Sequence, residues 1–172
     1  MVKNNNHQQF YNMFIKCLQD IFSAEDQLIK AMPKYMEAIS VDDLREKLKS
    51  HFNETKKQKD RLNKIFRELK ETPKGTVCEG MKGLLSECDK VIREDFPGVV
   101  KDAALISALQ KCEHYEIATY GALRTFAKHL ELSNVEEILQ EILEEERNAD
   151  KVLTGIAEGG WFTSGINAEA AQ

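Results

Sequence analysis

The chain has 172 residues, of which nine are glycine and three are proline, so residues that interrupt helices are scarce. Its charged fraction of 31% and hydrophobic fraction of 42% exclude an intrinsically disordered protein, and its net charge of −5 argues against nucleic acid as a partner. The sequence has no apolar run of the roughly 18–20 residues that a membrane span needs, no secretory signal pattern and no Cys-x-x-Cys pair among its four cysteines. We therefore expect a cytoplasmic helical protein that contacts neither nucleic acid nor a membrane.

Apolar residues recur with the 3.6-residue period of an α-helix along almost the whole chain. The pattern predicts a first helix over about 8–39. A second helix is expected to follow Asp42 and Asp43, whose side chains can cap its first turn and complement the helix dipole. The Thr-Pro-Lys-Gly segment at 72–75 then ends this helix.

The second half of the chain predicts three more helices. A short one is expected over about 77–93, and a long one over about 100–129. Ser133 and Asn134 are expected to cap the last helix. The tail at 159–172 loses the helical period, so we expect a docked or frayed end there.

The lengths of these helices predict how they assemble. Four of them have about 25–30 residues, which corresponds to matched rods of roughly 40 Å. The segment between the second and third long helices is too long for a hairpin turn, so we predict an all-α, ferritin-like four-helix bundle whose long crossover carries an extra short helix. The alternative is an up-down-up-down bundle with an appended helix. We expect a single domain over 1–172, with the bundle at about 8–158.

Polar residues interrupt the apolar stripe of each long helix at a similar depth. Glu25, for example, lies between Ile21 and Leu28 on the inward face of the first helix. Extending the four stripes places these side chains at one level: Glu25, His51, Glu54, Glu113, Glu116, Glu146 and Asp150. Buried carboxylates are costly unless cations or protons neutralise them, and oxygen ligands suit iron or manganese. A solvated stripe edge explains any single glutamate, but their coincidence on four helices favours a dinuclear metal site.

The spacing of the glutamates supports this interpretation. Glu25 precedes Glu54 by 29 positions, and Glu116 precedes Glu146 by 30 positions. Two helical hairpins related by a pseudo-twofold axis would therefore each present equivalent ligands, which is the arrangement that a dinuclear site needs.

Four segments of the chain resemble the YciF-like family of bacterial stress proteins. They lie at 23–28, at 51–58, at 101–121 with the Glu-His-Tyr-Glu block, and at 143–150. The resemblance covers about 14–156. It implies a ferritin-like, rubrerythrin-related bundle with an extra helix, which is usually dimeric and is linked to the general stress response.

The chain departs from the ligand pattern that this resemblance implies. Ferritin-like dinuclear sites use Glu-x-x-His on two helices, but Lys57 and Ala149 stand where the histidines are expected. His51 can reach the site from the other side of Glu54, with Gln58 or Asp150 as weaker oxygen ligands. Lys57, if it points inward, would instead neutralise the carboxylates in place of a metal.

Two functional hypotheses remain open at this point. In the first, a stress protein holds dinuclear iron or manganese and reacts with peroxide or oxygen, as an oxidoreductase of the ferroxidase or peroxidase type. The ligands expected first are Glu25, Glu54, Glu116 and Glu146, then Glu113 and Asp150, with His51 last. In the second hypothesis, a non-enzymatic homodimer retains the same cluster without metal. A Dps-like DNA protector is disfavoured because the chain lacks a basic tail.

Overall fold

The protein is described here by a computed structural model that covers residues 2–160 and 163–172. Its elements are α1 (Val2–Ala38), α2 (Asp42–Leu69), α3 (Glu79–Arg93), α4 (Gly98–His129), α5 (Ser133–Glu158), β1 (Gly159–Gly160), β2 (Thr163–Ser164) and α6 (Ile166–Ala170). Residues 161 and 162 of the predicted tail lie outside the described residues. Helix α1 begins earlier than expected, and α3 begins two residues later.

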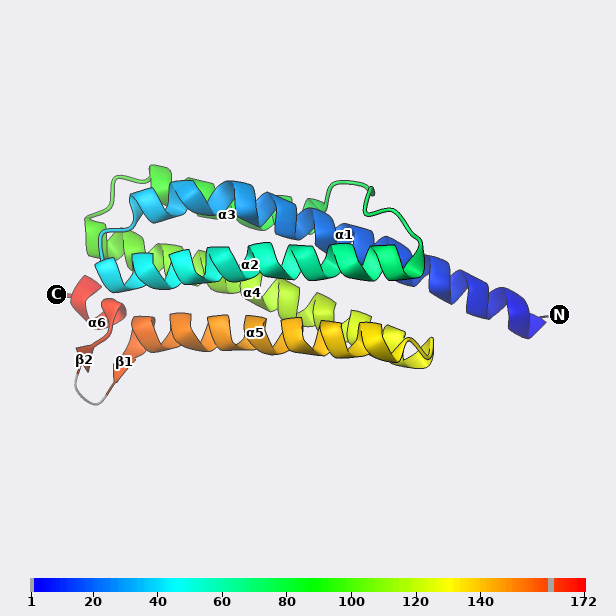
Figure 1. Cartoon of the computed structure of the whole chain (residues 1–172). Coiled ribbons are helices and arrows are strands. Elements are labelled where there is room, and N and C mark those ends of the chain that lie inside the picture. The colour runs from blue at the N-terminus through cyan, green and yellow to red at the C-terminus, as the bar shows by residue number, and fades with distance from the viewer. Residues whose placement is uncertain (1, 161–162) are drawn as a thin grey trace.

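The long helices form two antiparallel hairpins that pack against each other (Figure 1). Helices α1 and α2 make the first hairpin, and α4 and α5 make the second. Helix α3 returns along the bundle and packs on α1 and α4, so that α2 and α4 run in the same direction. The predicted crossover layout is therefore confirmed, and the up-down-up-down alternative is wrong.

The start of α2 differs from the prediction in how its backbone is capped. Asp42 and Asp43 lie in the first turn, where negative charge is favourable, but the N-cap position is taken by Val41. A buried carboxylate from α4 satisfies the backbone instead: Asp102 accepts hydrogen bonds from the N–H groups of Ser40 (3.1 Å) and Val41 (2.8 Å). The two hairpins are thus joined at this end of the bundle.

The start of α5 also differs from the prediction, while its end supports the docked tail. Leu132 occupies the N-cap, and Ser133 is already the first residue of the helix, so the expected Ser133–Asn134 cap is wrong. After α5, the two-residue strands β1 and β2 pair antiparallel. Helix α6 then packs on α4 and α5 with Ile166 buried, so this end of the chain is docked on the bundle.

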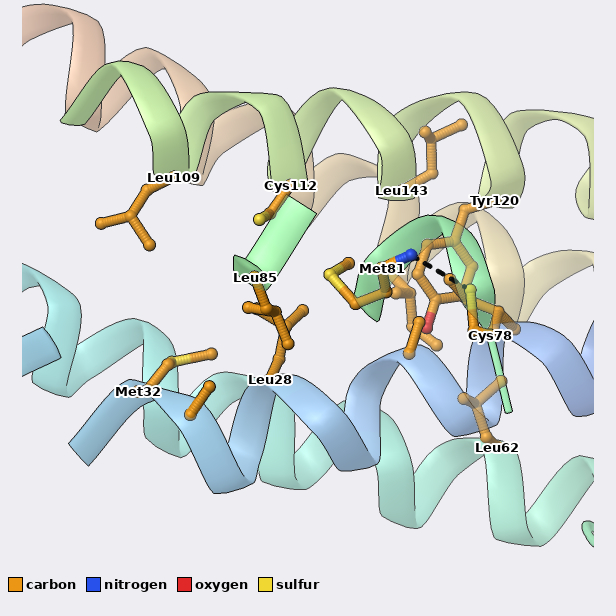
Figure 2. Close-up of a cluster of buried hydrophobic side chains, with 14 of the residues drawn as sticks. Leu28, Met32, Leu62, Cys78, Met81, Leu85, Leu109, Cys112, Tyr120 and Leu143 are labelled. Carbon is orange, nitrogen blue, oxygen red and sulfur yellow. Dashed lines mark hydrogen bonds between the residues drawn. The ribbon is translucent and has the colours of Figure 1, made fainter. Parts of the chain in front are cut away.

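Apolar layers enclose the level at which the polar residues meet. Figure 2 shows part of this core, in which Leu28 and Met32 of α1 face Leu85 of α3 and Leu109 of α4. Within α1, buried Ile21 lies one turn before Glu25. Among residues 2–160 and 163–172, none of the helices has both the length and the hydropathy that crossing a bilayer requires.

Candidate metal centre

Five titratable side chains converge inside the bundle from all four long helices. They are Glu25 of α1, His51 of α2, Glu113 and Glu116 of α4, and Glu146 of α5. The four glutamates are at most 2% exposed, and the His51 side chain is 10% exposed. Each is held at this depth because apolar residues one turn away on the same helix are packed in the core.

The five side chains form two overlapping triads. His51, Glu113 and Glu146 present ligand atoms that lie within 4.8 Å of one another, and so do Glu25, Glu116 and Glu146. Glu146 belongs to both triads. We call the first triad the outer position and the second the inner position. One shared carboxylate between two adjacent groups of ligands is the arrangement of a dinuclear centre.

Most of the polar atoms in the two triads lack a hydrogen-bond partner among the residues that the structure describes. They are Glu25 Oε2, Glu113 Oε2, Glu116 Oε1 and Oε2, Glu146 Oε2, and Nδ1 and Nε2 of His51. His51 Nε2 lies 3.2 Å from Glu113 Oε1, but the two atoms are not aligned as a hydrogen bond. Two ligands of one first-row metal ion, with bonds of about 2.1 Å, are separated by roughly 3.0–3.4 Å. The donor set therefore fits a metal ion, and it is incomplete without a cation or protons.

Burial gives these carboxyl groups unusual acidities. It is the main cause that raises the pKa of Glu25, to about 7, although a hydrogen bond from Tyr120 opposes it. Burial, reinforced by repulsion from neighbouring carboxylates, also raises the pKa of Glu116 and of Glu146 well above the ordinary range. Burial lowers the pKa of His51, but the carboxylates around it, led by Glu113, outweigh this effect and raise it. Each of these shifts favours the protonated form of its group when no metal is bound.

Two neutral side chains orient the carboxylates. The hydroxyl of Tyr120, fully buried on α4, points toward α1 (Figure 2) and donates a hydrogen bond to Glu25 Oε1. The amide of Gln58, also fully buried, donates to Glu146 Oε1 and to Glu145 Oε2 (3.1 Å). Such partners fix the direction in which a ligating carboxylate presents its free oxygen.

Two of the expected ligands lie outside both triads. The Glu54 side chain is 37% exposed, and its Oε2 is 4.0 Å from His51 Nδ1 at the edge of the outer position. Asp150 Oδ1 instead accepts a hydrogen bond from Gln110 (3.1 Å) and lies 3.3 Å from His114 Nε2. Lys57 is exposed, so it does not point inward, which was the condition for it to neutralise the carboxylates.

The inward line of α2 explains why His51, and not Glu54, lies inside the cluster. Core-facing positions on this helix alternate at spacings of four and three residues, through Leu44, Leu48, His51, Thr55, Gln58 and Leu62. Glu54 is rotated by about 80° from the middle of this line, which turns its carboxylate toward the helix flank. The four-three alternation is visible in the sequence and would have identified His51 as the inward residue.

A cavity of about 220 Å³ reaches the outer position between α2 and α5. His51, Glu54 and Glu113 line its polar end, and apolar side chains such as Leu48 and Val152 line its wall. The cavity therefore borders the outer position through His51 and Glu113, whereas neither Glu25 nor Glu116 of the inner position lines it.

Two sequence comparisons match most of this chain to known proteins. The model of the domain of unknown function DUF892 matches residues 9–171. The chain is 39% identical to protein YciF of Escherichia coli (strain K12) over 153 residues, which is 88% of this chain and 92% of YciF.

Three solved structures have a similar fold. The crystal structure of the E. coli stress protein YciF matches with a TM-score of 0.82 and 40% identity, over 84% of this chain and 92% of that one. YcfI from Rhodopseudomonas palustris matches with a TM-score of 0.83 and 37% identity, over 86% of this chain and 94% of that one. A protein from Xanthomonas campestris, at 20% identity and a TM-score of 0.67, shares the fold over 84% of this chain and 88% of its own.

Proposed function

We propose that this chain, which belongs to the DUF892 family of YciF-like proteins, binds two divalent iron or manganese ions in its bundle core as a bacterial stress protein. The observation that carries this proposal is the pair of triads joined through Glu146, most of whose polar atoms have no hydrogen-bond partner in the described part of the chain. The four glutamates carry a charge of −4 when ionised, and two divalent ions would supply +4. The cluster thus becomes neutral without retaining protons.

The chemistry of the donors supports iron or manganese over zinc. Four carboxylates and one imidazole make an oxygen-rich set, whereas structural zinc sites favour thiolate and imidazole. Iron or manganese held here would supply redox chemistry toward peroxide or oxygen, which is the activity that we propose.

The chain itself would orient the ligating carboxylates, give a small oxidant access to the centre and exclude bulk water. Tyr120 and Gln58 hold Glu25 and Glu146 in direction, and the apolar layers exclude bulk solvent from the inner position. The cavity at His51 would admit a small oxidant to the outer position only.

The alternative function is a non-enzymatic stress protein whose cluster is metal-free. The raised pKa values of Glu25, Glu116 and Glu146 favour it, because protons can neutralise these groups in place of a cation. The two functions differ in whether added metal displaces those protons.

Metal titration tests the proposal. We expect calorimetry with Mn²⁺, and elemental analysis after growth with iron or manganese, to give two ions per chain for the wild type. Glu146→Gln is expected to abolish binding at both positions, since Glu146 serves both. Asp102→Asn is the matched control, because it neutralises a buried carboxylate away from the cluster. A wild type that binds no Mn²⁺, or a Glu146→Gln variant that still binds two ions, would reject the proposal.

We further propose that the chain forms a homodimer. A groove of about 680 Å³ between α1 and α4 is lined by apolar residues that include Met13, Ala122 and Phe126, and Met13 is 38% exposed. A second copy of the chain seated there would remove this apolar surface from water. Light scattering coupled to size-exclusion chromatography is expected to give twice the mass of the chain, and a monomer at micromolar concentration would exclude the dimer.

A further inference from the structure

The surface around the outer position is strongly acidic on one side. Beside the cavity that reaches His51 lies a second hollow of about 340 Å³ between α2 and α5. Its lining includes Glu141, Glu144 and Glu145, with Arg61 paired to two of these carboxylates. Such a concave acidic surface raises the local concentration of cations.

Glu54 connects this acidic hollow with the buried cluster. It lines both the hollow and the cavity at His51, and so does Asn148. Its side chain is partly exposed, and its carboxylate is 4.0 Å from His51 Nδ1. Glu54 therefore faces the acidic hollow on one side and, on the other, the nine-tenths buried His51, whose ring nitrogens have no hydrogen-bond partner among the described residues.

The inner position lies behind the outer one when approached from this cavity. Glu113 and His51 line the cavity, whereas Glu25 and Glu116 do not. Glu146, which both positions share, is fully buried. An ion that arrives through the cavity meets the outer triad first.

We propose that Glu54 is a transfer ligand: it captures a divalent cation from the acidic hollow and delivers it to His51 and Glu113, so that the centre loads from the outer position inward. This inference rests on the proposed metal site and assigns Glu54 a kinetic role. Glu54 is not part of the filled centre, since it lies outside both triads. Glu54, which the sequence spacing favoured as a metal ligand, thus acts in loading the centre.

Loading kinetics test this inference directly. Metal-free protein is mixed with Mn²⁺ in a stopped-flow instrument with a metal indicator dye, and the final stoichiometry is measured from the electron paramagnetic resonance of free Mn²⁺. The wild type is expected to load in two phases. Glu54→Gln should slow the first phase by about threefold to tenfold and still bind two ions at equilibrium.

Two further variants test whether loading depends on capture at Glu54 and its cavity or on the surface charge of the protein in general. Glu137→Gln removes one exposed carboxylate from α5, two to three turns from Glu146, and is expected to load at the wild-type rate. Ala149→Leu narrows the cavity at His51 without changing charge, and is expected to slow loading as well. Raising the ionic strength should slow the wild type more than Glu54→Gln, because the capture step is electrostatic.

The other outcomes overturn the inference in distinct ways. A Glu54→Gln variant that binds fewer than two ions makes Glu54 a permanent ligand, and a variant that loads as fast as the wild type removes its role altogether. A wild type that binds no Mn²⁺ rejects the proposed metal site, and the transfer role with it.

Discussion

Replacing Glu25 by glutamine should stabilise the metal-free protein, although it alters a fully buried residue. Glutamine keeps the shape of the side chain and an oxygen that can accept the hydrogen bond from Tyr120. It removes a charge that the core solvates poorly, because burial raises the pKa of Glu25 to about 7 from an ordinary value of 4.5.

The size and sign of the effect follow from this difference in pKa. A carboxyl group whose pKa is higher in the folded state adds no penalty below its unfolded pKa, and stability falls as the pH rises through the folded pKa. For Glu25 the penalty is less than about 1 kcal/mol at pH 5 and about 3 kcal/mol at pH 8. Glu25→Gln should therefore raise the melting temperature by roughly 6–12 °C at pH 8 and by much less at pH 5.

Thermal unfolding by circular dichroism, with a chelator present at both pH values, measures this difference. The control is Asp102→Asn, which should lower stability by about 1.5–3 kcal/mol because Asp102 is hydrogen-bonded to Ser40 and Val41. With saturating Mn²⁺ the order should reverse at pH 8, since the wild type alone keeps all inner ligands. A Glu25→Gln variant that is less stable than the wild type in chelator at pH 8 would refute the reasoning.

Three other predictions concern the metal-bound state. Glu113→Gln should reduce the calorimetric stoichiometry from two Mn²⁺ ions to one, because Glu113 belongs only to the outer triad; loss of both ions would contradict this. Tyr120→Phe should weaken Mn²⁺ binding by about tenfold to a hundredfold at unchanged stoichiometry, and unchanged affinity would show that its hydrogen bond to Glu25 does not position the ligand. Mn²⁺ affinity should rise from pH 6 to pH 8, because the pKa of Glu25 is raised to about 7 and this ligand must lose its proton before it binds an ion. Calorimetry in buffers of different ionisation enthalpy counts the protons released, and a pH-independent affinity would contradict this prediction.

The architecture could be predicted because its determinants are local in the sequence. Scarce glycine and proline allow long helices, and the long segment between α2 and α4 requires a crossover. The capping of α2 could not be predicted in this way, since Asp102 lies 62 positions after Ser40 and 61 after Val41. A contact of that kind is visible only once the hairpins are packed.

The candidate site was predictable where the apolar stripes are continuous. Glu25, Glu116 and Glu146 are flanked by core residues one turn away, so their helix faces are fixed. His51 and Glu54 are only about 60° apart on the wheel of α2, so a small error in helix phase exchanges them. The pairing of Gln58 with Glu146 involves residues from different hairpins and had no signal in either helix alone.

A carboxylate that serves two positions also affects how the chain responds to metal concentration. The first ion would displace the proton that the metal-free protein keeps on Glu146, so the second ion would bind a carboxylate that is already ionised. We therefore expect positive cooperativity, with few singly occupied molecules at equilibrium. The protein would then change from metal-free to doubly occupied over a narrow range of free metal concentration, as a threshold sensor does.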